Sequence, residues 1–166
     1  MDFRRRFAIA TLVLLLSAGS AANSVSAADT GVTIDGQVQT TGHLTLRDLQ
    51  ALPPTSVSVS FATGHGQESG AYTGVLLWTL LANASIIDPD PKQHLRHTIL
   101  VTSGADQYAV ALSIGELDPK FEGKSVIIAY AKDGKPLDAQ DGLRLIVPGD
   151  AHGGRAVKNV AHIEVK

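Results

Sequence analysis

The sequence predicts an α+β domain that is mostly β. Apolar and polar residues alternate over several short runs, turn residues separate those runs at short intervals, and only brief stretches have a helical pattern. The chain has 166 residues, of which 44% are hydrophobic and 18% are charged, which suits one domain with a sizeable core. We therefore expect short strands with two or three short helices between them.

The first third of the domain begins with a hairpin and a helix. Residues 32–38 read as strands that turn at Asp35-Gly36. Residues 44–52 read as a helix that Thr45 and Asp48 can cap reciprocally, and two prolines follow it. Alternation over residues 57–61 then predicts a half-buried strand.

The middle of the chain is predicted to contain a glycine-rich loop at residues 64–70 and a buried helix at residues 75–82. A proline-bearing crossover and two further strands follow, and the alternation places Tyr108, Val110 and Leu112 on one face. The remaining predicted elements are a capped turn of helix at 113–116, a central strand at 126–131, a turn at 133–134, and strands at 143–147 and 161–165.

The first 28 residues have the pattern of a secretory signal peptide. Three arginines precede an apolar run of about ten residues, and small residues of the A-x-A type follow at 25–28. An uncleaved anchor is the alternative, but the run is shorter than the roughly 20 residues that span a bilayer. Arg-Arg-x-Phe at residues 4–7 also fits a twin-arginine signal, so the export route stays open. We expect residues 29–166 to form one periplasmic or secreted domain, with no membrane contact after cleavage.

Charge and cysteine content exclude several function classes. Cleavage after Ala28 would remove three cations and one acid, which changes the net charge from −2 to −4. An acidic chain of this kind is not expected to bind nucleic acid. The chain has no cysteine, so it has neither disulfides nor thiolate ligands for a metal.

Five segments in order resemble the molybdopterin-binding domain of the sulfite oxidase family, and in particular its small exported members. They are TLRDLQALP at 45–53, YTGVLLWTLL at 72–81, VTSGADQYAVALSIGELDP at 101–119, VIIAYAKDGKPL at 126–137 and GLRLIVPGDAHGGRAVKNVAHIEV at 142–165. The resemblance extends from about Val32 to the end of the sequence. It implies an α+β fold with a curved, mixed and mostly β sheet, and a molybdenum centre held on a pterin dithiolene.

The resemblance also implies where the cofactor would lie. The family's enzymes transfer an oxygen atom to or from small substrates and supply one cysteine to the metal, in the region that reads VSVSFATGHG at 57–66 here. This chain lacks that cysteine, and also lacks the aromatic-Arg-Asn-His segment that grips the pterin in those enzymes.

The loop PGDAHGGRAVKNV at 148–160 is longer than a hairpin turn requires. The resemblance implies that it holds the terminal phosphate of the pterin. Backbone N–H groups, the Arg155 guanidinium and the Lys158 ammonium could bind such an anion, with His152 as a further donor. Arg144 resembles the arginine that lies near the pterin in the family. The alternative is that the glycines supply positive φ and that the cations are solvated.

A metal held by histidine is a weaker hypothesis. His65 lies where the family has its thiolate, and His94 and His97 are three positions apart. No H-E-x-x-H pattern is present, so we expect these histidines to be hydrogen-bonding or surface residues.

Two functions remain open. The first is a molybdopterin-binding oxidoreductase-like protein in which Arg144, His152, Arg155 and Lys158 hold the cofactor without a protein thiolate; it would need an electron-transfer partner, because no haem motif is present. The second is a non-catalytic module that keeps the fold and binds another anion or a partner protein.

Overall fold

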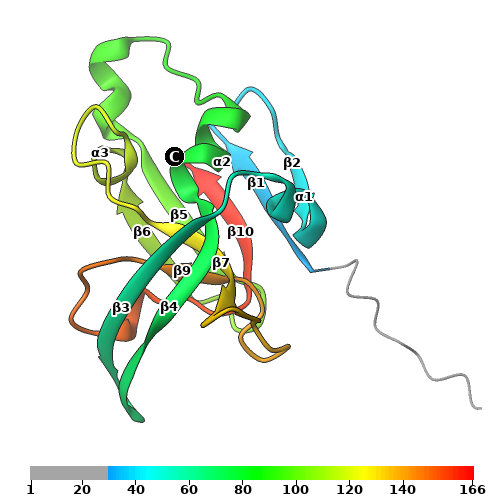
Figure 1. Cartoon of the computed structure of the whole chain (residues 1–166). Helices are drawn as coiled ribbons and strands as arrows, with labels where there is room; N and C mark the ends of the chain where they lie inside the picture. The colour runs from blue at the N-terminus through cyan, green and yellow to red at the C-terminus, as the bar shows by residue number, and fades with distance from the viewer. Residues whose placement is uncertain (1–29) are drawn as a thin grey trace, which may run out of the picture.

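The computed structural model describes residues 30–166, and the predicted signal peptide at residues 1–28 lies outside these residues. Two five-stranded sheets form the domain (Figure 1). In the first sheet the strand order is β2-β1-β10-β5-β6, and only β1 and β10 run parallel. These strands are β1 (Gly31–Gly36), β2 (Gly42–Thr45), β5 (Thr98–Ser103), β6 (Ala109–Ser113) and β10 (Val160–Val165).

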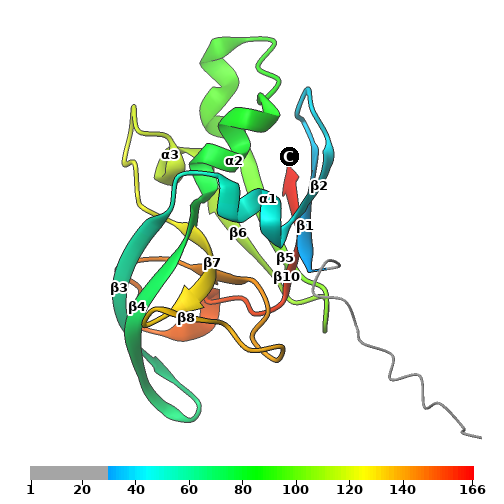
Figure 2. The same cartoon turned by 45° about the vertical axis from the view of Figure 1, so that its right-hand side comes forward.

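The second sheet is antiparallel and contains a long hairpin. Its order is β3-β4-β7-β8, and β9 also pairs with β7. The β3–β4 hairpin curves away from the helices, as Figure 2 shows. The strands are β3 (Thr55–Thr63), β4 (Gly66–Leu76), β7 (Ile127–Lys132), β8 (Lys135–Pro136) and β9 (Arg144–Ile146).

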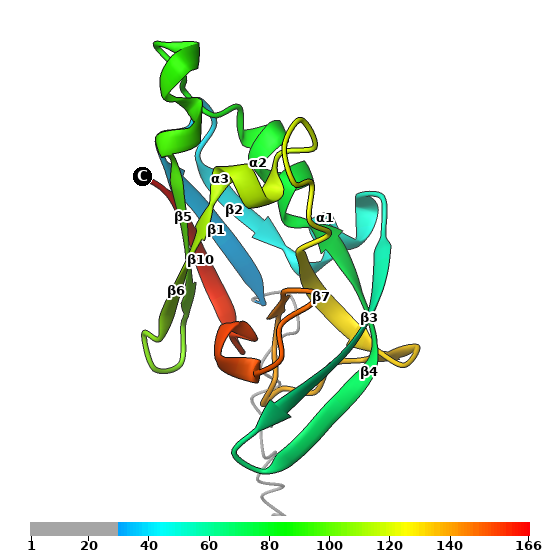
Figure 3. The same cartoon turned by 90° about the vertical axis from the view of Figure 1, so that its left-hand side faces the viewer.

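The three α-helices are short and lie toward one end of the two sheets (Figure 3). The capping boxes expected at Thr45–Asp48 and Ser113–Glu116 are both present, and they begin α1 and α3. Each box satisfies backbone donors that the first helical turn leaves free. The helical segments are α1 (Leu46–Ala51), α2 (Leu77–Ala84), α3 (Ile114–Leu117) and the 3₁₀ turns η2 (Pro91–Arg96) and η3 (Gly153–Arg155).

The main core brings together residues from both sheets and all three α-helices. Val32, Val101, Leu112 and Ile163 contribute from the first sheet, and Ile128 contributes from the second. A smaller cluster of Tyr72, Ile127, Ala129 and Ile146 fills the other side of β7. Since β7 contributes to both clusters, its continuous apolar sequence and its predicted central position are explained.

Three local predictions were wrong. The segment predicted as a glycine-rich loop at 64–70 is a two-residue turn, after which β4 starts at Gly66. The helix predicted from 75 starts at Leu77, because Val75 and Leu76 pair with β7. The strand β1 pairs with β2 and not with a strand at Val38, which forms only an isolated bridge to Ile86.

Close packing explains why the glycines of β4 belong to a strand. A Cβ on Gly74 would lie 2.1 Å from the Ile128 carbonyl oxygen, and one on Gly70 would lie 2.6 Å from Cε of Lys132. These glycines therefore allow neighbouring groups to approach β4 closely. Among residues 30–166, no helix is long and apolar enough to cross a membrane.

Candidate functional site

A pocket of about 540 Å³ opens between the tip of the β3–β4 hairpin and the loop that contains η3. The two segments are joined by the backbone, because Ala62 N–H donates to the Ala151 carbonyl at 2.9 Å and Ala62 forms a parallel bridge with His152. The loop at 148–158 thus meets the hairpin, as the anion-site hypothesis requires. The pocket is lined by Thr63, His65, Gly66, Gln67, Glu68, Ser69, Lys132, Arg144, Gly153, Ala156 and Lys158.

Arg144 lies at the base of this pocket and is buried. It donates to both carboxylate oxygens of Glu68, at 2.7 and 3.0 Å, and to the Tyr72 hydroxyl at 3.0 Å. Its guanidinium lies 5.8 Å from the Phe61 ring centroid and 5.5 Å from that of Tyr72. Most of its donors are therefore used within the protein, but its Nε is the one buried side-chain polar atom of residues 30–166 that has no partner.

Glu68 is held ionised by the same contacts. The hydrogen bond from Arg144 is the main reason that the pKa of Glu68 lies far below its usual 4.5, and bonds from Tyr72 and Lys132 act in the same direction against desolvation. Lys132 Nζ lies 3.1 Å from Glu68 Oε1 and 5.1 Å from the Tyr72 ring centroid.

Lys158 also lines the pocket, and its side chain is more exposed than those of Lys132 and Arg144. Its side chain is 53% exposed, and its ammonium lies 2.6 Å from Asp141 Oδ1. Asp141 also lies 3.5 Å from the Arg144 guanidinium. The cations Lys132, Arg144 and Lys158 therefore outnumber the carboxylates of Glu68 and Asp141 by one, which leaves a weakly positive site.

Arg155 does not line the pocket. Its guanidinium binds both carboxylate oxygens of Asp150, at 2.9 and 2.6 Å, and donates to Glu116 Oε1 at 3.1 Å. These bonds, above all those to Asp150, raise the pKa of Arg155 above its usual value. The structure thus uses this residue to connect the η3 loop to α3.

His152 and His65 both lie near the hairpin tip. His152 is exposed, is not among the residues that line the pocket, and among the described residues its side chain has no hydrogen-bond partner. His65 occupies the two-residue turn and lines the pocket.

His94 and His97 join a carboxylate network, and neither of them lines this pocket. His94 lies 2.7 Å from Asp88 and 3.0 Å from Asp118, while His97 lies 2.7 Å from the other oxygen of Asp88. These contacts are hydrogen bonds, as expected. Within residues 30–166, no group of three or more His, Asp or Glu residues is arranged to hold a metal ion.

Sequence reasoning missed Glu68, Tyr72 and Lys132. Glu68 and Tyr72 are four positions apart on β4, so they lie on one face of the strand, and Tyr72 donates to Glu68 at 2.6 Å. That spacing could have been recognised only if residues 66–76 had been predicted as a strand.

The chain matches the family described as "Oxidoreductase molybdopterin binding domain" over residues 19–166. It belongs to this family. The family resemblance predicted from five sequence segments is therefore confirmed.

A solved structure shows the same fold. The sulfane dehydrogenase SoxCD from Paracoccus pantotrophus matches with a TM-score of 0.70 and 21% sequence identity, over 85% of this chain. The match covers 39% of the SoxCD chain, so this protein corresponds to less than half of that length. The predicted α+β, mostly β fold with mixed sheets is confirmed by this likeness. Among curated proteins, none matches the sequence.

The residues around the pocket fit only one part of the family's cofactor. The pocket volume and the half-exposed Lys158 suit the phosphate-bearing end of a pterin. The metal end has no matching ligand, because the sequence contains no cysteine and the hairpin presents Thr63, Gly64 and His65 instead.

Proposed function

We propose that this protein is an exported, molybdopterin-binding oxidoreductase-like protein that lacks the cysteine ligand of its family. One observation carries the proposal: Lys132 of β7, Arg144 of β9 and Lys158, which follows η3, line a single pocket of about 540 Å³. The pocket lies beside the loop that the family resemblance associates with the phosphate. The signal-peptide pattern at residues 1–28 supports a periplasmic or secreted location.

The roles of the predicted residues differ in this proposal. Lys158 would contact the phosphate directly, since its ammonium is accessible and its Asp141 partner is shared with Arg144. Arg144 would contribute its positive charge from the base of the pocket. Arg155 would fix the shape of the η3 loop through Asp150 and Glu116, and His152 would act at the outer edge of the site.

The test is to purify the protein from a host that makes the molybdenum cofactor. After oxidation of the sample, pterin fluorescence is expected at a stoichiometric level in the wild-type protein and at a strongly reduced level in Lys158→Met. Lys92→Met removes an exposed cation on η2, outside the pocket, and should retain the pterin. Protein that folds normally but contains no pterin would contradict the proposal.

A non-catalytic module is the second candidate function. It is favoured by the carboxylates that already engage Arg144 and Arg155, and by the missing thiolate. In that case the pocket would bind a different small anion, or the domain would bind a partner protein. A thermal-shift screen distinguishes the two, because a ligand well above its Kd raises the Tm. A rise in Tm with simple anions but not with pterins would favour the non-catalytic module.

A further inference from the structure

The strand β3 is an open edge of the second sheet. It is nine residues long and pairs with β4 alone, and Figure 2 shows it on the outer side of the hairpin. The other edge strands are shorter: β2 has four residues, β6 has five, and β8 has two, one of which is Pro136. In the part of the chain that the structure describes, β3 is therefore the longest edge strand.

The sequence of β3 lacks the features that usually protect such an edge. Natural edge strands carry charged side chains, prolines or bulges that prevent pairing with another chain. The segment TSVSVSFAT contains no charge and no proline, and its pairing with β4 shows no register shift. On one face Val57 and Val59 pack against the smaller core cluster, and on the other Ser56, Ser58 and Ser60 are exposed.

The pairing with β4 determines which backbone groups of β3 are free. Ala62 donates its N–H away from β4, to the Ala151 carbonyl at 2.9 Å. Backbone groups of alternate residues in an antiparallel strand point to opposite sides, so those of Ser56, Ser58 and Ser60 also point away from β4. Among residues 30–166, none of these three serines has a hydrogen-bond partner for its backbone N–H or C=O.

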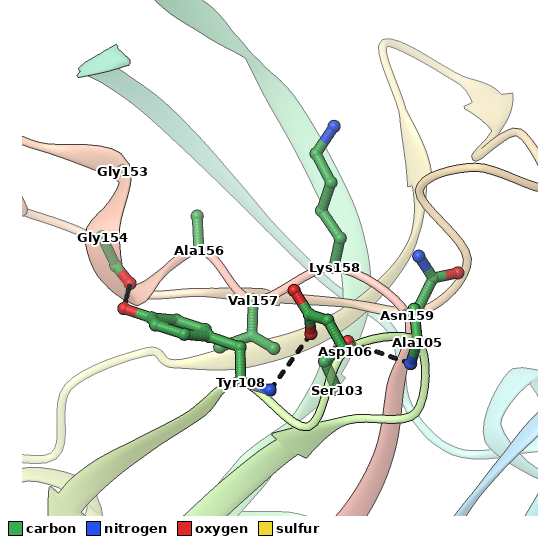
Figure 4. A pocket seen from close by; sticks show the side chains of 10 residues that line it. All are labelled: Ser103, Ala105, Asp106, Tyr108, Gly153, Gly154, Ala156, Val157, Lys158 and Asn159. Atoms are coloured by element: carbon green, nitrogen blue, oxygen red, sulfur yellow. Dashed lines mark hydrogen bonds between the residues drawn. The ribbon is translucent and has the colours of Figure 1, made fainter. Parts of the chain in front are cut away.

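The η3 loop closes one end of this free edge. The loop engages Ala62, and Tyr108 holds the loop from its other side by donating from its hydroxyl to the Gly154 carbonyl at 2.8 Å (Figure 4). Tyr108 was predicted on one face with Val110 and Leu112, but those two residues are buried and Tyr108 is half exposed. A further strand can therefore pair with β3 only before Ala62.

Pro54 closes the other end, because proline has no N–H to donate. Pro54 and Ala62 are each four positions from Ser58, so the free edge is symmetric about Ser58. An antiparallel second copy would place Ser58 opposite Ser58, Ser56 opposite Ser60, and Pro54 opposite Ala62. In this register each free serine meets a free serine, and the two closed positions meet each other.

From this symmetry we propose that β3 pairs with β3 of a second copy of this chain, antiparallel and about a two-fold axis at Ser58. Opposed serines exchange both of their backbone hydrogen bonds. Val57 then lies opposite Val59 of the second copy, at a non-hydrogen-bonded position where side chains approach closely. The absence of charge on β3 suits this pairing, because a two-fold axis brings identical side chains together.

The pairing joins the second sheets of two copies into one continuous sheet. Because the two β3 strands run in opposite directions, the two hairpin tips lie at opposite ends of the joined sheet. The pocket beside each tip is thus remote from the two-fold axis. The proposal is therefore independent of what that pocket binds.

Analytical ultracentrifugation of the purified protein tests the pairing. The wild type should form a dimer whose fraction rises with protein concentration, because so small a contact is weak. Ser58→Lys brings two ammonium groups together at the axis and should weaken dimerisation at least about tenfold. Ala71→Lys is the matched control, since Ala71 is exposed and lies beside Ser58 on β4, away from the edge. It should dimerise like the wild type, and circular dichroism should show that both variants are folded.

Single cysteines test the register, since the sequence contains no cysteine. Ser58→Cys should form a disulfide-linked dimer on mild oxidation with diamide, because opposed residues of a hydrogen-bonded pair have Cα atoms about 5.5 Å apart. Ser56→Cys should not, because the two cysteines would be about 13 Å or more apart. An equimolar mixture of Ser56→Cys and Ser60→Cys should cross-link.

Three results would overturn the proposal. A wild type that is monomeric at every concentration would do so, and it is the result expected if the edge accepts an extended segment of another protein instead. A dimer that Ser58→Lys leaves intact would use a different surface. Cross-linking of Ser56→Cys as readily as Ser58→Cys would show that the register is wrong.

Discussion

Arg144 and Glu68 lie 76 positions apart in the sequence and form a two-point ion pair, with Nη1–Oε1 and Nη2–Oε2 distances of 2.7 and 3.0 Å. The guanidinium is almost fully buried, whereas the carboxylate side chain is 25% exposed at the pocket. The pair connects β9 to β4 across β7. The arginine that was expected to bind a ligand is thus also paired with a carboxylate of the fold.

Glu68→Gln should destabilise the protein by about 3 kcal/mol, since it removes the main counter-charge of a buried guanidinium and leaves only Asp141, at 3.5 Å. Urea unfolding monitored by circular dichroism measures this difference. Glu122→Gln is the matched control, because Glu122 pairs with Lys124 at 3.0 Å but is half exposed. The control should lose no more than about 1 kcal/mol. Equal losses in both variants would show that burial does not determine the strength of the pair.

The stabilisation from Glu68 should depend on pH. Arg144 lowers the pKa of Glu68 in the folded protein, so the folded carboxylate stays ionised at pH values where the unfolded one binds a proton. The contribution is therefore complete above about pH 4.5 and is lost progressively as the pH falls below that value. Unfolding midpoints from pH 7 to pH 3 should show the wild type and Glu68→Gln converging. A constant difference across this range would contradict the assignment.

Gly153→Ala should destabilise the protein by about 1–2 kcal/mol, and Gly154→Ala should change stability by less than about 0.5 kcal/mol. A Cβ on Gly153 would lie 3.0 Å from two ring carbons of Phe61, and that buried ring packs below Arg144. A Cβ on Gly154 would meet no atom within 4 Å. Thermal unfolding of the two variants measures the difference. Positive φ is not the reason, because in this loop it occurs at Gly149 and Asn159 and at neither of these two glycines.

His94→Gln should lower stability by about 2 kcal/mol, and His162→Gln by no more than about 1 kcal/mol. His94 lies between two carboxylates, and Asp118 is nearly fully buried. His162 makes one bond of 2.8 Å to Asp35, and the side chains of His162 and Asp35 are both more than one-third exposed. Chemical denaturation at pH 6 measures the free energy of unfolding of both variants. A larger loss of stability for His162→Gln than for His94→Gln would contradict a stabilising role for the bonds of His94 to Asp88 and Asp118.

Local features of the fold could be predicted from the sequence, and long-range ones could not. The predicted capping boxes at Thr45 and Ser113 are present. They could be predicted because the two residues of each box lie three positions apart in the sequence. The hairpin tip was missed because glycine, serine and glutamine at 64–70 have low strand propensity, and pairing with β3 overrides that tendency.

The candidate site shows the same division. Placing Arg144 and Lys158 near one pocket followed from a family resemblance, and the structure brings both to it. The engagement of Arg144 by Glu68 depends on β4 and β9 both pairing with β7, which no local pattern reveals. The ion pair of Arg155 could have been predicted from the sequence. Its partner Asp150 precedes it by only five residues and accepts two of its hydrogen bonds.

The position of β10 has a consequence for how the chain acquires its shape during translation. This strand lies between β1 and β5, and among residues 30–166 no other strand connects the β2–β1 pair to the β5–β6 pair in its sheet. While residues 160–165 are still inside the ribosome, those two pairs have no partner between them. The first sheet must therefore remain incomplete until β10 has emerged.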